Sequence, residues 1–488
     1  MTITSPTPDL TGTRLRTGAD YLAALSDGRD VRVDGERVTD VAGHPAFRGV
    51  AETMAAMYDA AAVPGSPLVD PETGRLALFT VPRTRAQHDL RKVALEAWNR
   101  MSHGFIGRGP DHVSGLLAGF AGNPGVFDTD KHQHGATVVA FHDYAAARGL
   151  WITNSIVPPQ ANPNDPTSRV TPVHLVEKTS EGIVVSGAQM LGTGAAVADE
   201  IFVTSVRPLA PTEPEKALSF VVPVNAPGLR LICRRPYATS GSRFDYPLSN
   251  RLDESDAMVV FDRVLVPWDR VFAAGSVEVV NRQFFGTAAH QIGNLQSIIR
   301  LTAKLRFLTG VAAKVAQANG RDSDLAIKMQ LADLATIQTV SESLTESAHA
   351  FATADDQGVI RPAGKYLYAA LGMQTEVYPR AVRMLGELVG GGVIQVPSSV
   401  LDLDDPESSA SMDLLMGSDH LPVVERVKLF KLAWDLVGSE FAGRHVQYER
   451  FYSGAAPVVK MYAHRHYPFA EAEALVEEFL GSYDATER

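Results

Sequence analysis

The hydrophobic positions of the chain follow three successive patterns. As far as residue 149 they recur mostly at helical spacing, which predicts a mainly helical region. The predicted elements are a short helix over 18–26, a β-hairpin of 31–33 and 37–41 across Asp34-Gly35, and helices over 47–61, 84–101 and 112–120. Asp111 is a suitable N-cap for the last of these helices.

From residue 150 to residue 278 the pattern changes to short strands that end at proline or glycine. The predicted strands cover 150–157, 171–177, 182–189, 200–206, 217–224, 229–234 and 257–266. Many short strands at this spacing indicate a compact barrel or sandwich.

From residue 279 onward the apolar residues return to helical spacing. The predicted helices are one over 289–318, one that is capped by Ser323 and includes Leu331 to Leu344, one over 378–389, and one over 423–450. Four long amphipathic helices predict a bundle.

A patch of small residues at 190–196 lies between two of the predicted strands. Gly192 and Gly194 match the start of a dinucleotide fingerprint, but Val197 takes the place of its third glycine. Because a strand rather than a helix follows, the pattern excludes a Rossmann turn. Two interpretations of the patch remain: a hairpin in a barrel core, or a barrel wall against which a flavin lies.

The composition excludes several classes of protein. The formal net charge of −11, with acidic and basic residues interspersed, argues against nucleic acid or an anionic membrane as the main partner. Cys233 is the only cysteine, so an intrachain disulfide, a cysteine metal site and an iron–sulfur cluster are excluded. The pairs His132/His134 and His464/His466 lack an acidic partner pattern, so no metal site is expected. A polar N-terminus and the lack of a long apolar run predict a cytoplasmic protein.

The order of helices, strands and helices is that of the acyl-CoA dehydrogenase architecture, an α+β arrangement. Seven local segments narrow the resemblance: Gly107 to Asp111, Pro159 to Asn162, Gly187 to Glu200, Phe220 to Pro223, Asp256 to Asp262, Val266 to Arg270, and Tyr448 to Tyr452. With these segments the chain resembles the 4-hydroxyphenylacetate 3-monooxygenase family. Its members are the oxygenase components of two-component, flavin-dependent aromatic hydroxylases.

The resemblance implies both a fold and a reaction. The fold has an N-terminal helical domain (1–149), a central β-barrel (150–278), and a C-terminal four-helix bundle with a tail (279–488). The reaction uses FADH2 from a separate NAD(P)H-flavin reductase, with O2 as co-substrate. A C4a-hydroperoxyflavin then hydroxylates a phenolic or related aromatic substrate beside its OH group. The family also implies a homotetramer, and the chain shows no NAD(P)H fingerprint of its own.

Three residues are candidates for the catalytic chemistry through this resemblance. Arg108 would hold the distal peroxide oxygen and the developing substrate charge; the alternative is a surface arginine at a helix start, where the helix dipole disfavours a cation. His112, which replaces a tyrosine of many relatives, is a candidate base or a helix-surface histidine. His290 is a candidate base in the halophenol-hydroxylating relatives, or a histidine whose hydrogen bonds are satisfied at a helix start.

Other positions would contact the substrate. Asn154 replaces a histidine of the 4-hydroxyphenylacetate enzymes; it can form hydrogen bonds but cannot take a proton, and otherwise it is a polar residue at a strand end. The loop from Ser205 to Glu215 is a candidate lid, with Ser205 and Val206 against the substrate. The substrate stays open among hydroxyphenylacetate, a chlorinated or nitrated phenol, a carrier-bound tyrosine and a heteroaromatic acid.

The FAD contacts of the family carry over onto this chain residue by residue. They fall on Asn154, Ser155, Ile156, Val157, Gln160, Ala161, Asn162, Thr193, Gly391, Gly392, Phe451, Tyr452, Ser453 and Gly454. Thr193 would bond to the isoalloxazine edge. The two glycines at 391–392 would touch the adenine of a neighbouring subunit's FAD, or simply end a helix. These residues do not separate FAD from FMN.

Two other functions stay open at this stage. One is an acyl-CoA dehydrogenase-like flavin oxidoreductase that binds a thioester and holds FAD permanently. The other is a non-catalytic oligomeric scaffold. The colour of the purified protein would separate the two flavin hypotheses. An acyl-CoA dehydrogenase-like protein would be yellow, whereas the monooxygenase would be colourless.

Overall fold

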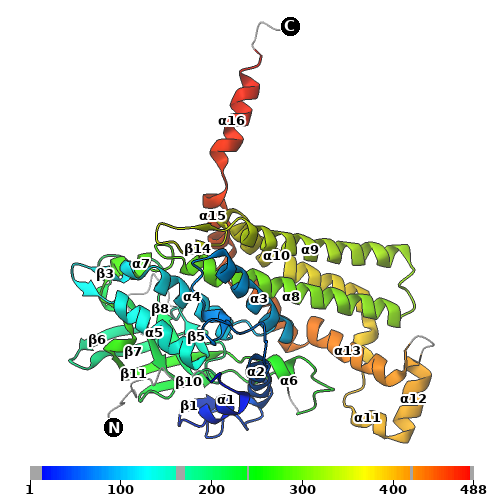
Figure 1. Cartoon of the computed structure of the whole chain (residues 1–488). Coiled ribbons are helices and arrows are strands. Elements are labelled where there is room, and N and C mark those ends of the chain that lie inside the picture. Colours follow the sequence, from blue (N-terminus) through cyan, green and yellow to red (C-terminus); the bar gives the residue numbers. More distant parts are fainter. Residues whose placement is uncertain (1–13, 161–170, 239–240, 418–420, 484–488) are drawn as a thin grey trace.

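The computed structural model describes residues 14–160, 171–238, 241–417 and 421–483 (Figure 1). Helices lie at both ends of this mixed α+β chain, and most of the strands lie between them. Ala161 and Asn162, two of the predicted FAD contacts, fall outside the described residues.

Five α-helices of the described residues lie before residue 150. They are α1 (Gly18–Ala24), α2 (Arg48–Ala61), α3 (Arg85–Met101), α4 (Pro110–Gly122) and α5 (Gly135–Arg148). The sequence did not predict α5, because its buried face places Gly135 and His142 beside Val138 and Phe141 and so interrupts the apolar stripe.

The start of α4 corrects the prediction for Asp111. The helix begins at Pro110 with Gly109 as the N-cap residue, so Asp111 lies inside the first turn. Its carboxylate is buried and accepts hydrogen bonds from Asn99 Nδ2 (3.0 Å) and Gln296 Nε2 (2.8 Å). The acidic side chain therefore ties α4 to two other helices and does not cap its own.

The strands form two main sheets and, within the described residues, do not close into the predicted barrel. The larger sheet has the order β2-β1-β10-β11-β7-β6 and the smaller one β12-β9-β8-β5. Their bounds are β1 Asp30–Val33, β2 Glu36–Val38, β5 Ile152–Ser155, β6 His174–Lys178, β7 Gly182–Gln189, β8 Glu200–Thr204, β9 Leu218–Pro223, β10 Leu229–Cys233, β11 Ala257–Pro267 and β12 Val271–Ala274. Two small ribbons are β3 (Asp128–Thr129) with β4 (His132–Gln133), and β13 (Thr353–Ala354) with β14 (Ile360–Arg361).

The two sheets pack against each other through apolar side chains. Phe220 of β9 meets Phe261 of β11 edge to face, with ring centroids 6.1 Å apart. The predicted hairpin is confirmed, since β1 and β2 pair in antiparallel fashion across Asp34 and Gly35. β1 also runs parallel to β10, so this hairpin joins the larger sheet from a part of the chain about 200 residues away.

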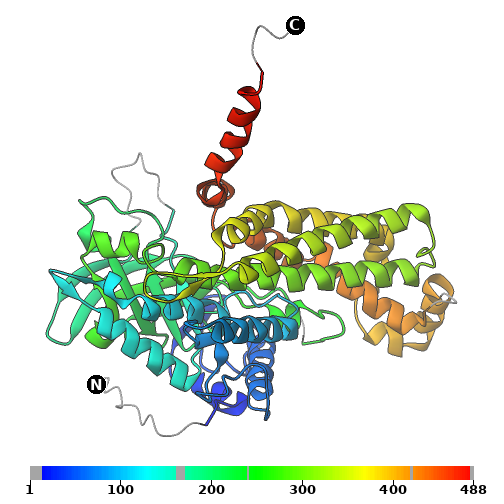
Figure 2. The ribbon, with the colours of Figure 1, turned by 45° about the horizontal axis from the view of Figure 1, so that its top comes forward.

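Three long helices form the centre of the C-terminal part: α8 (Ala289–Ala318), α9 (Leu325–Ala350) and α10 (Gly364–Val389) (Figures 1 and 2). α13 (Val423–Val437) and α14 (Glu440–Phe451) pack against α10. The shorter helices are α6 (Ser249–Leu252), α7 (Val277–Arg282), α11 (Leu401–Asp404), α12 (Pro406–Met416), α15 (Ala456–His466) and α16 (Phe469–Leu480).

Three predicted helix boundaries in this part are wrong. α10 begins at Gly364 rather than Tyr378, because packing against α8 and α9 carries the helix through Pro379. The predicted helix over 423–450 is two helices that are separated at Gly438, and the Ser439 side chain caps the second one. Asp324, not Ser323, occupies the N-cap of α9.

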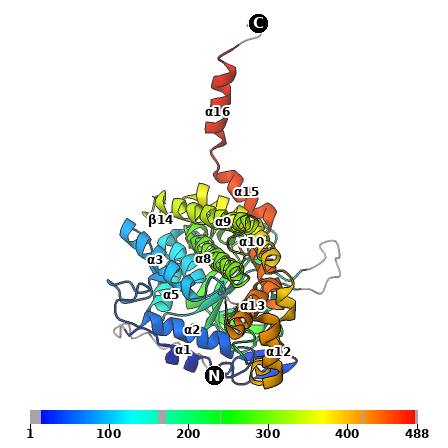
Figure 3. The same ribbon diagram turned by 90° about the vertical axis from the view of Figure 1, so that its right-hand side faces the viewer.

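The last helix, α16, extends away from the rest of the molecule in all three ribbon views (Figures 1, 2 and 3). It has no buried residue, and Leu475 and Phe479 are 69% and 68% exposed. None of the described helices combines the length and hydrophobicity that a membrane span requires.

Candidate active site

The turn before α4 holds Arg108 in a fixed backbone position. Glu254 Oε1 accepts hydrogen bonds from the N–H groups of Gly107 (2.9 Å) and Arg108 (2.7 Å). Trp151 Nε1 donates to the Arg108 carbonyl at 2.7 Å. Position 107 favours glycine, because a Cβ there would stand 2.4 Å from Tyr448 Oη and would force that ring to shift. The glycines of this turn therefore serve close packing around Arg108.

The guanidinium of Arg108 is half-buried and already has two partners in the protein. Nη1 lies 2.7 Å from His112 Nε2, and Nη2 donates to the Tyr452 carbonyl at 2.7 Å. The guanidinium carbon also lies 4.1 Å from the centroid of the Tyr452 ring, a cation–π distance. Arg108 is thus a positioned cation rather than a free surface side chain.

The contact with Arg108 determines the tautomer of His112. An arginine N–H can only donate, so His112 Nε2 must accept and the ring proton must be on Nδ1. His112 is 7% exposed, and its Nδ1 has no hydrogen-bond partner among the described residues. Burial, and then the charge of Arg108, hold the pKa of His112 well below its ordinary value of 6.5, against a smaller opposite effect of the nearby Gln296 side chain, which makes no hydrogen bond with Nδ1. His112 is therefore neutral and offers an unpaired N–H.

Asn154 lies on β5, on the side of the strand that faces α4. It stands beside Phe202 in the parallel β5–β8 pair, and the Phe202 ring meets Phe120 of α4 with centroids 5.8 Å apart. Asn154 is 4% exposed, and its Oδ1 has no partner among the described residues. Asn154 thus brings a buried, unpaired polar atom to the contact between α4 and the smaller sheet, and His112 Nδ1 in the first turn of α4 is a second such atom.

The small-residue patch packs against the opposite side of β5. Thr153 Oγ1 donates to the Thr193 carbonyl at 2.5 Å, and Ser155 Oγ donates to the Met190 carbonyl at 3.0 Å. A Cβ at Gly194 would stand 3.0 Å from the Trp151 ring. The patch thus allows a close backbone approach, one of the two interpretations of its sequence. The Thr193 hydroxyl donates to Asp256 Oδ1 at 2.6 Å and keeps lone pairs for a ligand.

The segment 451–454 divides into an exposed and a buried part. Phe451 is 53% exposed, whereas Tyr452 is 4% exposed. Tyr452 Oη lies 2.5 Å from the Gly107 carbonyl oxygen and 2.7 Å from Gln296 Oε1. Ser453 and Gly454 are half-buried. Tyr452 therefore anchors the Arg108 turn, a contact that no pattern in the sequence predicts.

His290 is surrounded by aromatic side chains and is not brought to the Arg108–His112 pair. Its Nδ1 lies 3.0 Å from Tyr368 Oη, and its ring stacks on Phe285 with centroids 4.3 Å apart. Burial lowers the pKa of His290 to about 3, with a further contribution from His466. These contacts direct the His290 ring toward α10 and α15. Arg108 instead lies just before α4, and His112 lies in the first turn of that helix.

The remaining predicted contacts lie on several other segments. Val206 is 48% exposed, and the loop that follows it is fastened to α7 by two hydrogen bonds between Asn281 and the Leu209 backbone (2.9 and 3.0 Å). Gln160 is exposed, and Gly391 and Gly392 belong to a short 3₁₀ helix, η5 (Gly390–Gln395). Ile156 and Val157 follow β5 and are half-buried.

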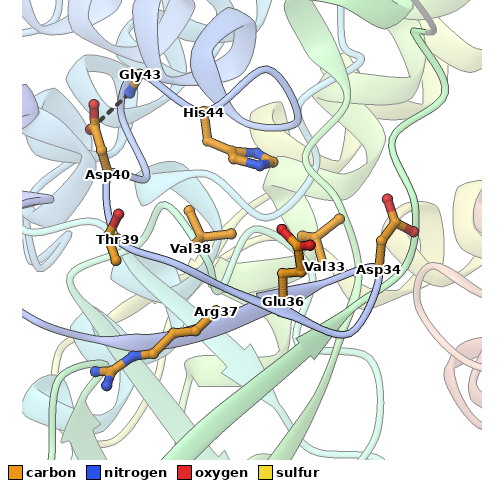
Figure 4. A pocket seen from close by; sticks show the side chains of 9 residues that line it. All are labelled: Val33, Asp34, Glu36, Arg37, Val38, Thr39, Asp40, Gly43 and His44. Carbon is orange, nitrogen blue, oxygen red and sulfur yellow. Dashed lines mark hydrogen bonds between the residues drawn. The ribbon is translucent and has the colours of Figure 1, made fainter.

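A separate surface pocket of about 320 Å³ lies on the β1–β2 hairpin and the loop after it (Figure 4). Its lining residues are Val33, Asp34, Glu36, Arg37, Val38, Thr39, Asp40, Gly43 and His44. It shares no residue with the predicted site.

Two family models match the chain in succession. The model described as 4-hydroxyphenylacetate 3-hydroxylase N terminal matches residues 17–273, and the corresponding C terminal model matches residues 280–481. Together they cover almost the whole chain.

Curated relatives match over nearly their full length. The pyoverdin chromophore biosynthetic protein of Pseudomonas aeruginosa is 34% identical, with 96% of each chain covered. The 4-hydroxyphenylacetate 3-monooxygenase oxygenase component of the same organism is 32% identical, over 97% of this chain and 94% of the relative. The oxygenase component of a Rhodococcus 4-nitrophenol 2-monooxygenase is 34% identical, over 92% and 88%.

Solved structures agree with this similarity. A 4-hydroxyphenylacetate 3-monooxygenase oxygenase component in complex with FAD and 4-hydroxyphenylacetate superposes with a TM-score of 0.90 at 31% identity, over 96% of this chain and 98% of that one. A 4-hydroxybutyryl-CoA dehydratase of N. maritimus superposes with a TM-score of 0.87 at 18% identity, over 97% and 96%. That second likeness concerns the acyl-CoA dehydrogenase-like fold alone.

The buried polar atoms of the site fit an aromatic ligand with polar edges. A buried polar atom without a partner costs about 1–3 kcal/mol. His112 Nδ1 offers an N–H and Asn154 Oδ1 offers an acceptor, and neither has a partner within the described part of the chain. A phenol hydroxyl or the ring edge of a flavin would supply such partners.

Proposed function

Because the chain belongs to the 4-hydroxyphenylacetate 3-hydroxylase family, the oxygenase components of FADH2-dependent aromatic monooxygenases, we propose that it hydroxylates a phenol at the carbon beside its OH group. The observation that carries this proposal is the Arg108–His112 pair, in which a fixed cation lies beside a buried, unpaired imidazole N–H. The free N–H can donate to a ring oxygen that gains negative charge, and the cation on the other ring nitrogen favours that charge.

Arg108 and His112 would stabilise the substrate oxygen as an anion. The substrate would leave its phenolic proton in the solvent as it binds, and His112 Nδ1–H would then donate to the ring oxygen. Arg108 would supply positive charge from a position that Tyr452 and Glu254 fix in advance. An anionic ring oxygen makes the adjacent ring carbon electron-rich, and that carbon attacks an electrophilic oxygen.

The role of His112 as a general base stays a prediction. In the arrangement described, its one free lone pair, on Nε2, accepts a hydrogen bond from Arg108. His112 could take a proton from the substrate only after Arg108 had left Nε2. The donor role needs no such movement, and for this reason we favour it. Asn154, whose Oδ1 has no partner among the described residues, would contact the flavin or a polar group of the substrate.

The same site would hold the reduced flavin along the edge of β5. Reduced FAD, when bound, supplies the two electrons with which O2 is split, one oxygen atom going into the product and the other into water. We propose contacts from Asn154 to Val157, from Gln160, from Thr193 and from Phe451 to Gly454. The Thr193 hydroxyl, which is fixed by Asp256, would accept a hydrogen bond from the ring edge. A separate NAD(P)H-flavin reductase would supply FADH2.

The substrate class follows from the chemistry of the site and from the relatives. Relatives act on 4-hydroxyphenylacetate and 4-nitrophenol, as their names state, and both compounds carry a phenol. We therefore propose a para-substituted phenol as substrate. The acyl-CoA dehydrogenase-like alternative has no support from the matching family models.

A binding experiment tests the donor role without turnover. Phenol and phenolate forms of 4-nitrophenol absorb at different wavelengths, so a difference spectrum on binding reports the ionisation of the ligand. We expect the bound ligand to be phenolate below its ordinary pKa in the wild type and in His112→Gln, which retains an N–H donor. His112→Leu should bind it as the neutral phenol. Binding as phenol in the wild type would contradict the proposal, and a screen of phenols with FADH2 and O2 would then identify the ring that is hydroxylated.

A further inference from the structure

Glu254 is wholly buried and holds the Arg108 turn through the backbone. A single carboxylate oxygen accepts the N–H groups of two successive residues, Gly107 and Arg108, at 2.9 and 2.7 Å. Two bonds to one oxygen fix both the position and the direction of the peptide from which the Arg108 side chain leaves. Hydrogen bonds to a charged acceptor are about twice as strong as neutral ones.

Glu254 is connected in turn to the other side of the site. Its second oxygen lies 3.5 Å from Arg444 Nη1 on α14. Arg444 also binds Asp256 through Nη2 (2.8 Å) and Nε (3.1 Å). Asp256 Oδ1 accepts the hydroxyl of Thr193 at 2.6 Å. One arginine of the C-terminal part therefore joins the Arg108 turn to the small-residue patch.

We propose that Glu254 is a positioning residue for hydroxylation, which acts with Arg444 and Asp256 to set the place of Arg108 relative to Thr193. This inference rests on the proposed function, in which Arg108 contacts the substrate and Thr193 the flavin. Hydroxylation requires that the ring carbon and the activated oxygen lie close together and are correctly aligned. A misplacement of about 1 Å can lower the rate about 100-fold.

Arg444 serves both Glu254 and Asp256 because carboxylates outnumber cations around it. Two cations, Arg234 and Arg444, face three carboxylates, those of Asp253, Glu254 and Asp256. Arg234 binds Asp253 and Asp256, so Arg444 is the one cation near Glu254 in the set. Removal of the charge of Glu254 would leave Arg444 to Asp256 alone.

A matched control exists elsewhere in the chain. Asp435 of α13 is also buried, and its Oδ2 accepts the N–H groups of two successive residues, Leu248 and Ser249, each at 3.0 Å. Burial raises the pKa of both carboxyls, Glu254 and Asp435. Each carboxylate thus binds two successive backbone N–H groups, but Asp435 also accepts the Ser249 hydroxyl (3.1 Å) and holds the start of α6 rather than the Arg108 turn.

The test compares Glu254→Gln with Asp435→Asn in the full-length enzyme. The first readout is the rate of phenol hydroxylation, followed together with the share of consumed O2 that is released as hydrogen peroxide. The second is the fluorine NMR signal of Trp151 in protein labelled with 5-fluorotryptophan, because its indole N–H binds the Arg108 carbonyl. The chain has four tryptophans, so Trp151→Phe identifies the signal.

We expect Glu254→Gln to shift the Trp151 signal and to lower the hydroxylation rate by about 10- to 100-fold. Asp435→Asn should do neither. The proposal is overturned if Glu254→Gln leaves both readouts unchanged, or if the two variants lose hydroxylation equally. Should Glu254→Gln fail to fold, Arg444→Lys tests the same link with Glu254 intact. A wild type that hydroxylates no phenol removes the proposed function instead, and the Trp151 shift still tests whether Glu254 places the turn.

Discussion

Arg108 and Tyr452 bind each other across 344 positions of the sequence. The guanidinium donates to the Tyr452 carbonyl at 2.7 Å and lies 4.1 Å from the centre of its ring. A second guanidinium, that of Arg300, lies 4.0 Å from the same ring centre and pairs with Glu449 at 2.6 Å. The end of α14 thus serves as the support for the turn that carries Arg108.

The hydroxyl of Tyr452 should contribute to stability, and that of Tyr448 should not. Tyr452 Oη contacts the Gly107 carbonyl and Gln296, whereas Tyr448 Oη has no partner among the described residues. We expect Tyr452→Phe to lower the free energy of unfolding by about 1–2 kcal/mol, and Tyr448→Phe to change it little or raise it. Urea unfolding of the two variants measures the difference, and equal losses would contradict it.

Arg108→Ala should fold normally and lose hydroxylation. The side chain is half-buried on a turn whose backbone Glu254 holds independently, so packing should survive. Loss of a charged donor at the developing anion costs roughly 3 kcal/mol or more of barrier. Arg108→Lys should not restore activity, because one ammonium group cannot reach both His112 and the Tyr452 carbonyl as the guanidinium fork does. Product yield and peroxide release, followed together, decide the matter, and an unchanged product yield in Arg108→Ala would refute the prediction.

His112 should not set the pH dependence of hydroxylation near neutral pH. As the candidate base, His112 would define the acid limb of the rate profile by its own titration, but burial and Arg108 hold its pKa well below 6.5. We therefore expect His112→Gln to keep the shape of the rate profile above about pH 6, around the ~6.5 reference value. Stopped-flow rates across this range test it, and loss of the acid limb in His112→Gln would restore the base role.

The lowered pKa of His112 also predicts that the free energy of unfolding decreases as the pH falls. Because the folded pKa lies below the unfolded value, the unfolded chain binds the proton more readily between the two, and stability falls as the pH drops below about 6.5. The slope for one such histidine approaches about 1.4 kcal/mol per pH unit. Urea unfolding at about pH 7 and about pH 5.5, on either side of that reference, should show a smaller difference for His112→Gln than for the wild type. The same difference in both proteins would show that His112 titrates normally.

We expect a homotetramer that is built through the C-terminal helices. α16 buries none of its residues within the chain, and Leu414 and Leu415 of α12 are 86% and 81% exposed. Apolar surface of this extent favours association with further copies. Light scattering should give four chains for the full-length protein and fewer for a chain that ends at Tyr467. Substitution of Phe479 by serine should weaken the assembly more than the same change at Glu477, and a monomeric wild type would contradict the prediction.

The sequence predicted the regular parts of the fold where one local pattern dominates. The strand over 182–189 has the predicted bounds, and the apolar stripe of α8 ends as expected before Gly320. Boundaries that depend on distant packing were wrong, as in α10, which continues through Pro379. The sequence could not distinguish two separate sheets from a closed barrel, because the hydrophobic pattern of one strand does not show which strands it pairs with.

The candidate site was predictable only in its local part. Arg108 and His112 are four residues apart, so a turn followed by a helix brings them together. Glu254 and Tyr452 reach the same turn from residues far along the chain. Glu254 belongs to no recognised motif, and the segment of Tyr452 indicated a flavin contact rather than support for Arg108. His290 lies on the predicted helix, yet a helix has several faces, and its ring points toward α10.

The contact between Arg108 and Tyr452 also has a consequence for how the enzyme is made. A ribosome releases the N-terminal part of a chain first, and that part can begin to fold while synthesis continues. The Arg108 turn is complete early, but Tyr452 and Arg444 leave the ribosome only after more than 300 further residues. A nascent or prematurely terminated chain therefore has Arg108 without its contacts to the C-terminal helices. Such a chain should be unable to hydroxylate a substrate before translation is nearly finished.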